Sequence, residues 1–168
     1  EALGGSPPMS PIEAHIFAEE LGWASADFSI AVGVAGFPFR WAAMSGNQEL
    51  IEKFVKPYVA DTEVRYVGCW AITEPMHGSD TLNMGGEEFT DPEITHELKA
   101  RLDGDEWVIS GQKSAWVSNG TIATHALAFL GVEPSRGMAG GGVAFIPLDL
   151  PGVSRGKPLD KLGQRALN

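Results

Sequence analysis

The sequence predicts an α+β protein in which N-terminal helices are followed by a small antiparallel β-barrel. Apolar residues recur at helical spacing over roughly the first 58 residues, and from Val67 onward they alternate as in strands. Six short strand-like segments with glycine-rich connections indicate a barrel attached to a helical layer. We therefore expect part of a helical domain at residues 1–58 and a central β-barrel domain at residues 59–168.

The first helix is predicted at about residues 11–21. It starts at Ser10-Pro-Ile-Glu13, a capping box with proline at the first helical position, and apolar residues follow at helical spacing. Asp27 can cap a second apolar helix, and Pro38 bends or restarts that helix.

A third helix is predicted from Asn47 to Val55, and Pro57 is expected to end it because proline donates no backbone hydrogen bond. The most apolar segment, residues 28–44, is interrupted by two glycines, a proline and an arginine. It falls short of the roughly 20 apolar residues that a membrane span needs. We expect a buried helix there.

Period-two alternation predicts six strands, with turn residues between them. They are expected at residues 67–72, 96–102, 107–110, 113–118, 125–132 and 143–147. The tight link Asp103-Gly-Asp-Glu106 predicts that the second and third strands form a hairpin. Residues 81–95, which carry acidic residues around Phe89, are expected to be a surface insertion between the first two strands.

Composition excludes several kinds of partner. The net charge of −10 and isoelectric point of about 4.7 mean that nucleic acid and anionic membrane surfaces would repel the chain. The single cysteine, Cys69, allows no internal disulfide and fits a reducing compartment. The four histidines lack metal-ligand spacing, so no metal site is predicted.

The run Cys69-Trp-Ala-Ile-Thr-Glu-Pro-Met-His-Gly-Ser-Asp80 turns an apolar strand abruptly into a polar loop. Thr73, Ser79 and Asp80 bring hydroxyls and a carboxylate next to backbone amides that Gly78 leaves sterically open. A polar or polyanionic cofactor could lie across such a loop. An ordinary exit from a strand into a turn has the same composition, so this run alone leaves both interpretations open.

A second run, Trp107-Val-Ile-Ser-Gly-Gln-Lys-Ser-Ala-Trp-Val-Ser-Asn-Gly120, is expected to form two short strands around a turn at Gly111. Trp116 and Ser118 then lie on one face of the second strand. An indole beside a hydroxyl suits a flat heteroaromatic ring, which the indole can stack against and the hydroxyl can hydrogen-bond. A tryptophan packed in a barrel wall would look the same in isolation.

Three stretches in this order resemble the acyl-CoA dehydrogenase family: Thr73-Glu-Pro-x-x-Gly-Ser-Asp80, Gly111-Gln-Lys-x-x-Trp-x-Ser-Asn-Gly120 and Asp160-Lys-Leu-Gly-Gln-Arg165. The resemblance runs from about Pro11 to Asn168 and stops before the family's C-terminal helical bundle. In that family the flavin of FAD lies against the central domain, and the catalytic carboxylate comes from the bundle. The resemblance implies a fragment of a longer enzyme, with FAD as cofactor, no catalytic residue in this chain and no activity on its own.

The resemblance also implies which residues hold the cofactor. They are Trp70, Ile72, Thr73, Gly78, Ser79, Trp116 and Ser118. Trp70, Ile72 and Thr73 would line the isoalloxazine. Gly78 and Ser79 would approach the FAD pyrophosphate, and Trp116 and Ser118 would flank the reactive flavin edge. Ser79 is also expected near the pantetheine of the substrate.

Desaturation of an acyl thioester needs a base for the α-proton, an acceptor for the hydride and dipoles at the carbonyl. No amino-acid side chain accepts hydride, so a flavin must supply that step. Glu74 and Asp80 are carboxylates of the first motif, but we expect neither to be the base. The resemblance assigns that role to a segment outside this chain, and Glu74-Pro75 is typical of a turn.

The leading hypothesis is FAD-dependent α,β-dehydrogenation of an acyl-CoA thioester. Two alternatives stay open: a flavin monooxygenase or nitroalkane oxidase of the same fold, and a flavin-free binding or scaffold protein. Met76-His77 replaces the family's usual Gly-Ala and adds bulk where the backbone is nearly bare, which keeps the scaffold alternative open. The retained pair Trp116 and Ser118 argues against a scaffold.

The resemblance implies an acyl-CoA thioester as substrate and an electron-transfer flavoprotein or similar acceptor as partner. It also implies a homodimer or homotetramer for the full-length protein. We expect no nucleic-acid or membrane partner. The expected location is the cytoplasm, or the mitochondrial matrix in a eukaryote.

Overall fold

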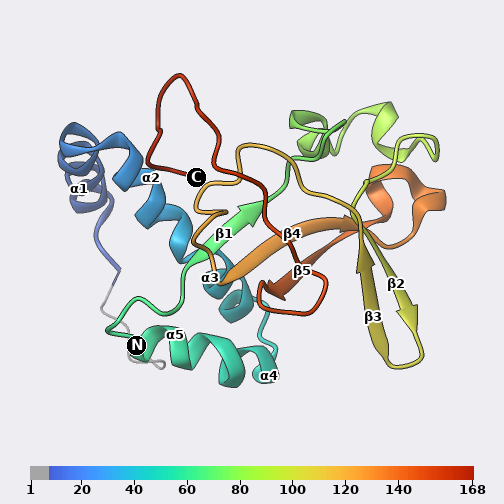
Figure 1. The fold of residues 1–168 in the computed structure, drawn as a ribbon, viewed down its shortest axis with the longest axis horizontal. Helices are drawn as coiled ribbons and strands as arrows, with labels where there is room; N and C mark the ends of the chain where they lie inside the picture. The colour runs from blue at the N-terminus through green and yellow to red at the C-terminus, as the bar shows by residue number, and fades with distance from the viewer. Residues whose placement is uncertain (1–7) are drawn as a thin grey trace. The chain divides into compact units, whose positions relative to one another are not determined.

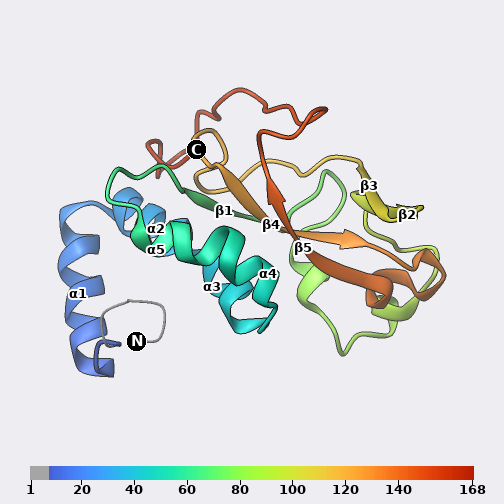
Figure 2. The same ribbon diagram turned by 90° about the horizontal axis from the view of Figure 1, so that it is seen from below.

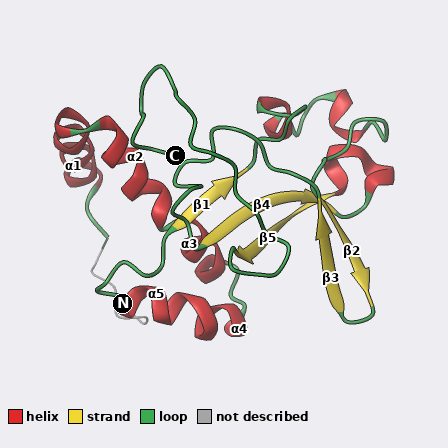
Figure 3. Ribbon diagram, in the orientation of Figure 1, coloured by secondary structure: helices red, strands yellow, loops and turns green. Residues whose placement is uncertain are grey.

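The structure is a computed structural model that describes residues 8–168, and these fall into two compact units. The first unit contains the residues up to Cys69 together with 118–125 and 147–168. The second contains residues 70–117 and 126–146. Helices occupy the N-terminal part of the chain and strands follow (Figure 1, Figure 3), which confirms the α+β class.

Helix α1 (Pro11–Ala24) starts at the predicted capping box. The Ser10 hydroxyl accepts a hydrogen bond from the Glu13 amide at 3.3 Å, and the Ser10 amide donates to the Glu13 carboxylate at 2.8 Å. These bonds satisfy donors that the first turn of any helix leaves free. None of the residues of α1 is fully buried.

Helix α2 (Ala26–Ala35) starts at Ser25, so the predicted cap at Asp27 is wrong. The Ser25 hydroxyl accepts a hydrogen bond from the Phe28 amide at 3.2 Å. The Asp27 carboxylate instead accepts from the amide of Ala166 at 2.9 Å, within the same unit. The side chain of Asp27 therefore bonds to a residue distant in the sequence and, contrary to the local pattern, does not cap the helix.

Helix α3 (Phe37–Met44) follows directly and has Pro38 in its first turn, so the predicted restart at this proline is confirmed. The expectation of one buried helix over residues 28–44 is only partly right. Helix α2 buries no residue fully, whereas α3 buries Pro38, Phe39 and Ala42.

Three further segments form one continuous helical rod in Figure 2: α4 (Gln48–Leu50), η1 (Ile51–Val55) and α5 (Lys56–Ala60). The predicted end of this helix before Pro57 is wrong. In η1, a π-helical turn, the Lys56 amide donates to the carbonyl of Ile51, five residues back. Pro57 then falls in the first turn of α5, where a missing N–H is tolerated.

Phe39 is the centre of the core of the first unit and is 1% exposed. Its ring stacks on Tyr58 with the centroids 4.1 Å apart, and it meets Tyr66 and His125 edge-on. Cys69 is buried in the same unit, and burial raises the pKa of its thiol to about 11. The thiol is therefore protonated at neutral pH.

Between residues 8 and 168 no helix has both the length and the apolar character needed to cross a membrane.

The strands form a five-stranded sheet in the order β1-β4-β2-β3, with β5 paired to β4. Their bounds are β1 (Gly68–Ala71), β2 (Lys99–Asp103), β3 (Glu106–Ser110), β4 (His125–Gly131) and β5 (Gly141–Pro147). The predicted hairpin is confirmed, since β2 and β3 are antiparallel with Asp103 opposite Glu106. The sheet of the described residues is open and β2 pairs parallel with β4, so a closed antiparallel barrel is not confirmed.

The strand predicted at residues 113–118 is wrong, because the structure has an irregular segment there. The first two residues of the segment are tied by hydrogen bonds to the chain just after β1. Trp116 then has a φ of 72°, which an extended strand excludes. Trp116 and Ser118 therefore do not share a strand face.

Residues 81–95, the predicted insertion, carry short 3-10 turns: η2 (Ser79–Leu82) overlaps its start and η3 (Glu87–Thr90) lies within it. Within the second unit η3 packs against a further turn, η4 (Pro134–Gly140). The approach is close at Gly137, where a Cβ atom would lie 2.4 Å from the carbonyl oxygen of Asp91.

Replacing Gly111 with alanine should destabilise the chain by about 3 kcal/mol or more. The φ of Gly111 is +131°, and a Cβ atom there would lie 2.4 Å from the carbonyl oxygen of Glu97. Gly104→Ala is the matched control, because its φ of +66° is also positive but nothing lies within 4 Å of its Cβ position. It should cost only about 1–2 kcal/mol. Urea unfolding measures both losses, and equal losses would contradict the packing argument.

Candidate functional site

The polar loop after β1 begins with a tight turn at Glu74. The Glu74 amide donates to the carbonyl of His77 at 2.8 Å, and the His77 amide donates back to the Glu74 carbonyl at 3.3 Å. Pro75 and Met76 occupy the turn between them, and the Met76 side chain is exposed. The bulk that Met76 adds therefore lies at the surface and does not fill the loop.

The carboxylate of Glu74 is buried, with 0% of the side chain exposed. Its Oε1 lies 2.8 Å from Nζ of Lys113 and also accepts the Leu98 amide at 3.0 Å. Its Oε2 accepts the Glu97 amide at 2.8 Å. Donors from two other segments of the second unit thus occupy both oxygens.

Burial alone would raise the pKa of Glu74, but the hydrogen bonds from Lys113 and from the two amides outweigh it and hold this pKa below its ordinary value. His96 Nδ1 lies 3.8 Å from Oε2 of Glu74 and has no hydrogen-bond partner among the described residues. Burial lowers the pKa of His96, and Glu74 offsets this only in part. His96 is therefore neutral at pH 7, and the buried ion pair is Glu74 with Lys113.

The same lysine joins the two sequence motifs. Nζ of Lys113 donates to the carbonyl of Ile72 at 2.8 Å, and the amide of Ser114 donates to the carbonyl of Thr73 at 2.9 Å. Trp116 comes two residues after Ser114, and 67% of its surface is exposed. The bonds therefore hold an open indole close to the exit of β1.

The second unit contains six of the seven residues predicted to hold a cofactor. They are Trp70, Ile72, Thr73, Gly78, Ser79 and Trp116. The first three are half-buried at the end of β1, and the ring of Trp70 lies 6.3 Å from that of Phe129. Ser79 is exposed at the start of η2. The seventh residue, Ser118, is half-buried in the first unit.

His77 folds back onto Asp80, with its Nδ1 2.7 Å from Oδ2 of the carboxylate. The Gly78 amide donates to Oδ1 at 2.6 Å. Burial would raise the pKa of Asp80, but these two partners outweigh it and leave the pKa below its ordinary value. Asp80 is therefore ionised at neutral pH, with both oxygens engaged.

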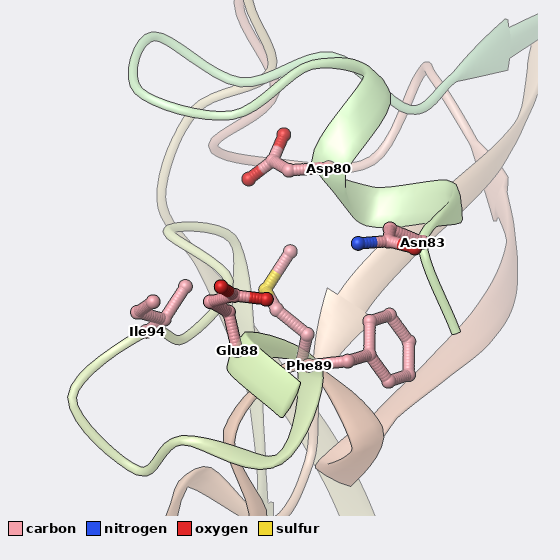
Figure 4. A pocket seen from close by; sticks show the side chains of 6 residues that line it. Asp80, Asn83, Glu88, Phe89 and Ile94 are labelled. Carbon is pink, nitrogen blue, oxygen red and sulfur yellow. The ribbon is translucent and has the colours of Figure 1, made fainter. Parts of the chain in front are cut away.

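A cavity of about 380 Å³ lies beside Asp80 (Figure 4). Its lining consists of Asp80, Asn83, Glu88, Phe89, Ile94 and Met138. Figure 4 shows Asp80 on one side of the space and Glu88 with Phe89 on the opposite side. Although two carboxylates line it, no three His, Cys, Asp or Glu side chains within residues 8–168 are placed to hold a metal ion. The insertion thus shapes the surface next to the first motif.

Two buried or half-buried residues, one in each unit, make structural hydrogen bonds but had no role assigned from the sequence. Lys113 is the lone cation of the second motif. Its pairing with the glutamate of the first motif could have been predicted from these two residue types. Asn119 is buried, and its Nδ2 donates to the carbonyls of Ala31 at 2.9 Å and Gly68 at 3.3 Å in the first unit. No local pattern marks Asn119, because its partners lie 88 and 51 residues away in the sequence.

Glu74→Gln should destabilise the protein by about 3–5 kcal/mol at pH 7, because it leaves the buried ammonium of Lys113 without its counter-charge. The pKa of Glu74 is lower in the folded than in the unfolded protein. Its stabilisation is thus present above the unfolded value of about 4.3 and is lost as the pH falls through the folded value. Urea unfolding between pH 7 and pH 3 should show a smaller acid-induced loss for the variant.

The matched control is Glu97→Gln. The carboxylate of the half-buried Glu97 accepts the Met76 amide at 2.9 Å, and a glutamine can still accept that bond. This variant should stay within about 1 kcal/mol of the parent protein. A loss at Glu97 as large as that at Glu74 would contradict the role given to the buried pair.

Comparison with known proteins identifies relatives of this chain. The sequence profile of the acyl-CoA dehydrogenase middle domain matches residues 69–168. The mitochondrial short-chain specific acyl-CoA dehydrogenase of Bos taurus is 35% identical over 121 residues, which are 72% of this chain and 26% of that protein. The chain thus spans about a quarter of the length of this curated relative.

Solved structures share the fold. Glutaryl-CoA dehydrogenase from Mycobacterium smegmatis matches with a TM-score of 0.73 at 24% identity, over 95% of this chain and 36% of that one. A glutaryl-CoA dehydrogenase from the same organism in complex with FADH2 matches with a TM-score of 0.66 at 26% identity, over 89% and 34% of the two chains. Because the middle-domain profile covers more than half of its residues, the chain belongs to the acyl-CoA dehydrogenase family.

Proposed function

We propose that this chain supplies the flavin-facing wall of an FAD-dependent enzyme that introduces a double bond between the α- and β-carbons of an acyl-CoA thioester. The observation that carries the proposal is the pair of hydrogen bonds from Lys113 and Ser114 to the carbonyls of Ile72 and Thr73. These two bonds join the motif at residues 73–80 and the motif at residues 111–120 into one surface. Family membership and the FADH2 complex of a 26% identical protein support the choice of cofactor.

The residues present fit a flavin. The exposed indole of Trp116 offers an open aromatic face close to Thr73. At Gly78 nothing lies within 4 Å of the position of a Cβ atom, so a ligand has room to approach the backbone, although the Gly78 amide already donates to Asp80. The exposed Ser79 adds a hydroxyl next to this opening.

The residues that would hold FAD are Trp70, Ile72, Thr73, Gly78, Ser79, Trp116 and Ser118. We assign Trp70, Ile72 and Thr73 to the isoalloxazine. Gly78 and Ser79 are assigned to the pyrophosphate, and Trp116 and Ser118 to the reactive edge of the flavin. When bound, the flavin would accept the hydride that leaves the β-carbon. We also assign Ser79 to the pantetheine of the substrate.

Neither carboxylate of the first motif suits the role of base. Glu74 is buried and accepts hydrogen bonds at both oxygens. Both oxygens of Asp80 are engaged by His77 and Gly78. A general base works best with a pKa near the operating pH, and the pKa of each of these carboxylates is held below its ordinary value. By resemblance to the family alone, we propose that proton abstraction belongs to a residue outside residues 1–168.

Other parts of the proposal are supported by the family alone. These are the division into a helical part at 1–58 and a flavin domain at 59–168, the closed form of the barrel, an electron-transfer flavoprotein or similar acceptor, and a homodimer or homotetramer. The bovine relative is named as mitochondrial, which supports the matrix as the location in a eukaryote. In a bacterium the corresponding location is the cytoplasm.

The protein that contains this chain should lose its oxidised flavin absorbance when it is titrated without oxygen with a panel of acyl-CoA thioesters. Hydride transfer from one substrate class reduces the flavin, so the thioester that bleaches the band identifies that class. A yellow protein that no thioester bleaches, but that consumes oxygen with another substrate, would replace the dehydrogenase by an oxidase. A colourless protein that takes up no FAD would overturn the flavin assignment.

Trp116→Ala should weaken FAD binding about 3- to 10-fold, since the proposed ring contact is lost. Quenching of flavin fluorescence on binding to the apoprotein measures the dissociation constant. Trp107→Ala is the matched control, because this tryptophan in β3 is also exposed but is not assigned to the cofactor. Equal weakening by both variants would remove Trp116 from the assignment.

A further inference from the structure

A second cavity, of about 650 Å³, lies within the first unit. Its walls come from the helical rod at η1, from the residues just before β1, and from the chain around the start of β4 and the end of β5. None of the seven residues assigned to FAD lines it. The proposed FAD site therefore does not include this cavity.

Three aromatic rings form the buried side of the cavity. Tyr66 stacks on His125 with the centroids 5.6 Å apart and the planes at 18°, and Phe54 meets His125 at 5.4 Å. His125 is buried, whereas Phe54 and Tyr66 are half-buried. Burial lowers the pKa of His125, and Asp149 offsets this only in part, so the ring is neutral at pH 7. The cavity thus offers a flat, uncharged surface.

The charged residues that line the cavity are mostly basic, although Glu63 and Asp61 lie beside Arg65 and the chain carries a net charge of −10. Its charged lining residues are Lys53, Arg65, Arg155 and Asp149, three cations against one carboxylate. All four are exposed. This local excess of positive charge favours an anionic ligand.

The three cations are held near the rings and keep donors for a ligand. Arg155 Nη2 donates to the carbonyl of Ala123 at 2.7 Å, a bond that uses one of the five guanidinium donors. Nζ of Lys53 lies 5.2 Å from the ring centroid of Phe54. Arg65 pairs with Glu63, but both side chains are more than 60% exposed, and such pairs add little stability. An anion can therefore take the place of Glu63.

We propose that this cavity binds a small organic anion with a planar ring, an aromatic phosphate or carboxylate. The ring lies against Phe54 and Tyr66, and the anionic group is held by Arg65, Arg155 and Lys53. Guanidinium groups suit phosphate and carboxylate because their paired donors match the two oxygens. The volume of about 650 Å³ falls within the range of small-molecule sites, roughly 300–1,000 Å³. The proposal does not depend on the proposed function.

The probe for this site is phenyl phosphate, titrated by calorimetry into the protein that contains this chain, once with FAD added and once without. One saturable site is expected, with binding that weakens as salt is raised from about 0.01 to 0.15 M. Inorganic phosphate and phenol, which carry only the charge or only the ring, should each bind at least about tenfold more weakly. Phosphate binding as tight as phenyl phosphate binding would overturn the role of the rings.

Arg65→Gln should weaken phenyl phosphate binding about tenfold or more. Arg101→Gln is the matched control, because Arg101 is 69% exposed and pairs with Asp103 two residues away, as the 71% exposed Arg65 pairs with Glu63. It should leave binding unchanged. Equal affinities of the two variants would overturn the proposal.

Two further variants keep the test independent of folding. Lys53→Gln removes a cation that lies over the ring of Phe54, and it should also weaken binding. Asp149→Asn removes the one carboxylate of the lining and should tighten binding, a gain that a misfolded protein cannot produce. Unchanged binding in both variants would overturn the electrostatic part of the proposal.

Discussion

The second unit depends on the buried carboxylate of Glu74. It ties the exit of β1 to the amides of Glu97 and Leu98 ahead of β2, and through Lys113 it fixes the segment that carries Trp116. Separating such a pair leaves a charge in the interior, which costs far more than a surface ion pair contributes. The three segments therefore assemble together. The indole is positioned by a charge pair and by two backbone carbonyls, without the help of a strand ladder.

Local patterns predicted those parts of the fold whose bonds are local. The capping box at Ser10, the restart at Pro38 and the β2–β3 hairpin each depend on residues within a few positions of one another. The sequence failed where a distant partner competes: Asp27 is captured by Ala166, 139 residues away, and leaves the cap to Ser25. Period-two alternation at residues 113–118 suggested a strand, but tertiary hydrogen bonds impose an irregular path there.

The candidate site was predictable to a similar degree. Motif spacing located the loop after β1 and singled out Trp116, because both depend on residue identity and order. It could not reveal that Met76 points outward or that His77 closes on Asp80, since these depend on side-chain choices within one turn. The group of cations that lines the second cavity could not be predicted from the sequence for another reason. Its cations, Lys53, Arg65 and Arg155, are spread over about a hundred residues of a strongly acidic chain, so no window of sequence shows them as a cluster.

The burial of Glu74 also bears on how relatives of this chain are recognised. Its carboxylate holds three segments of the second unit together, so a folded protein needs Glu74 whether or not it is catalytically active. A search built on that glutamate would therefore select for the architecture and not for activity. If Trp116 and Ser79 hold the cofactor as proposed, these exposed positions would distinguish active from inactive relatives, because stability alone does not require them.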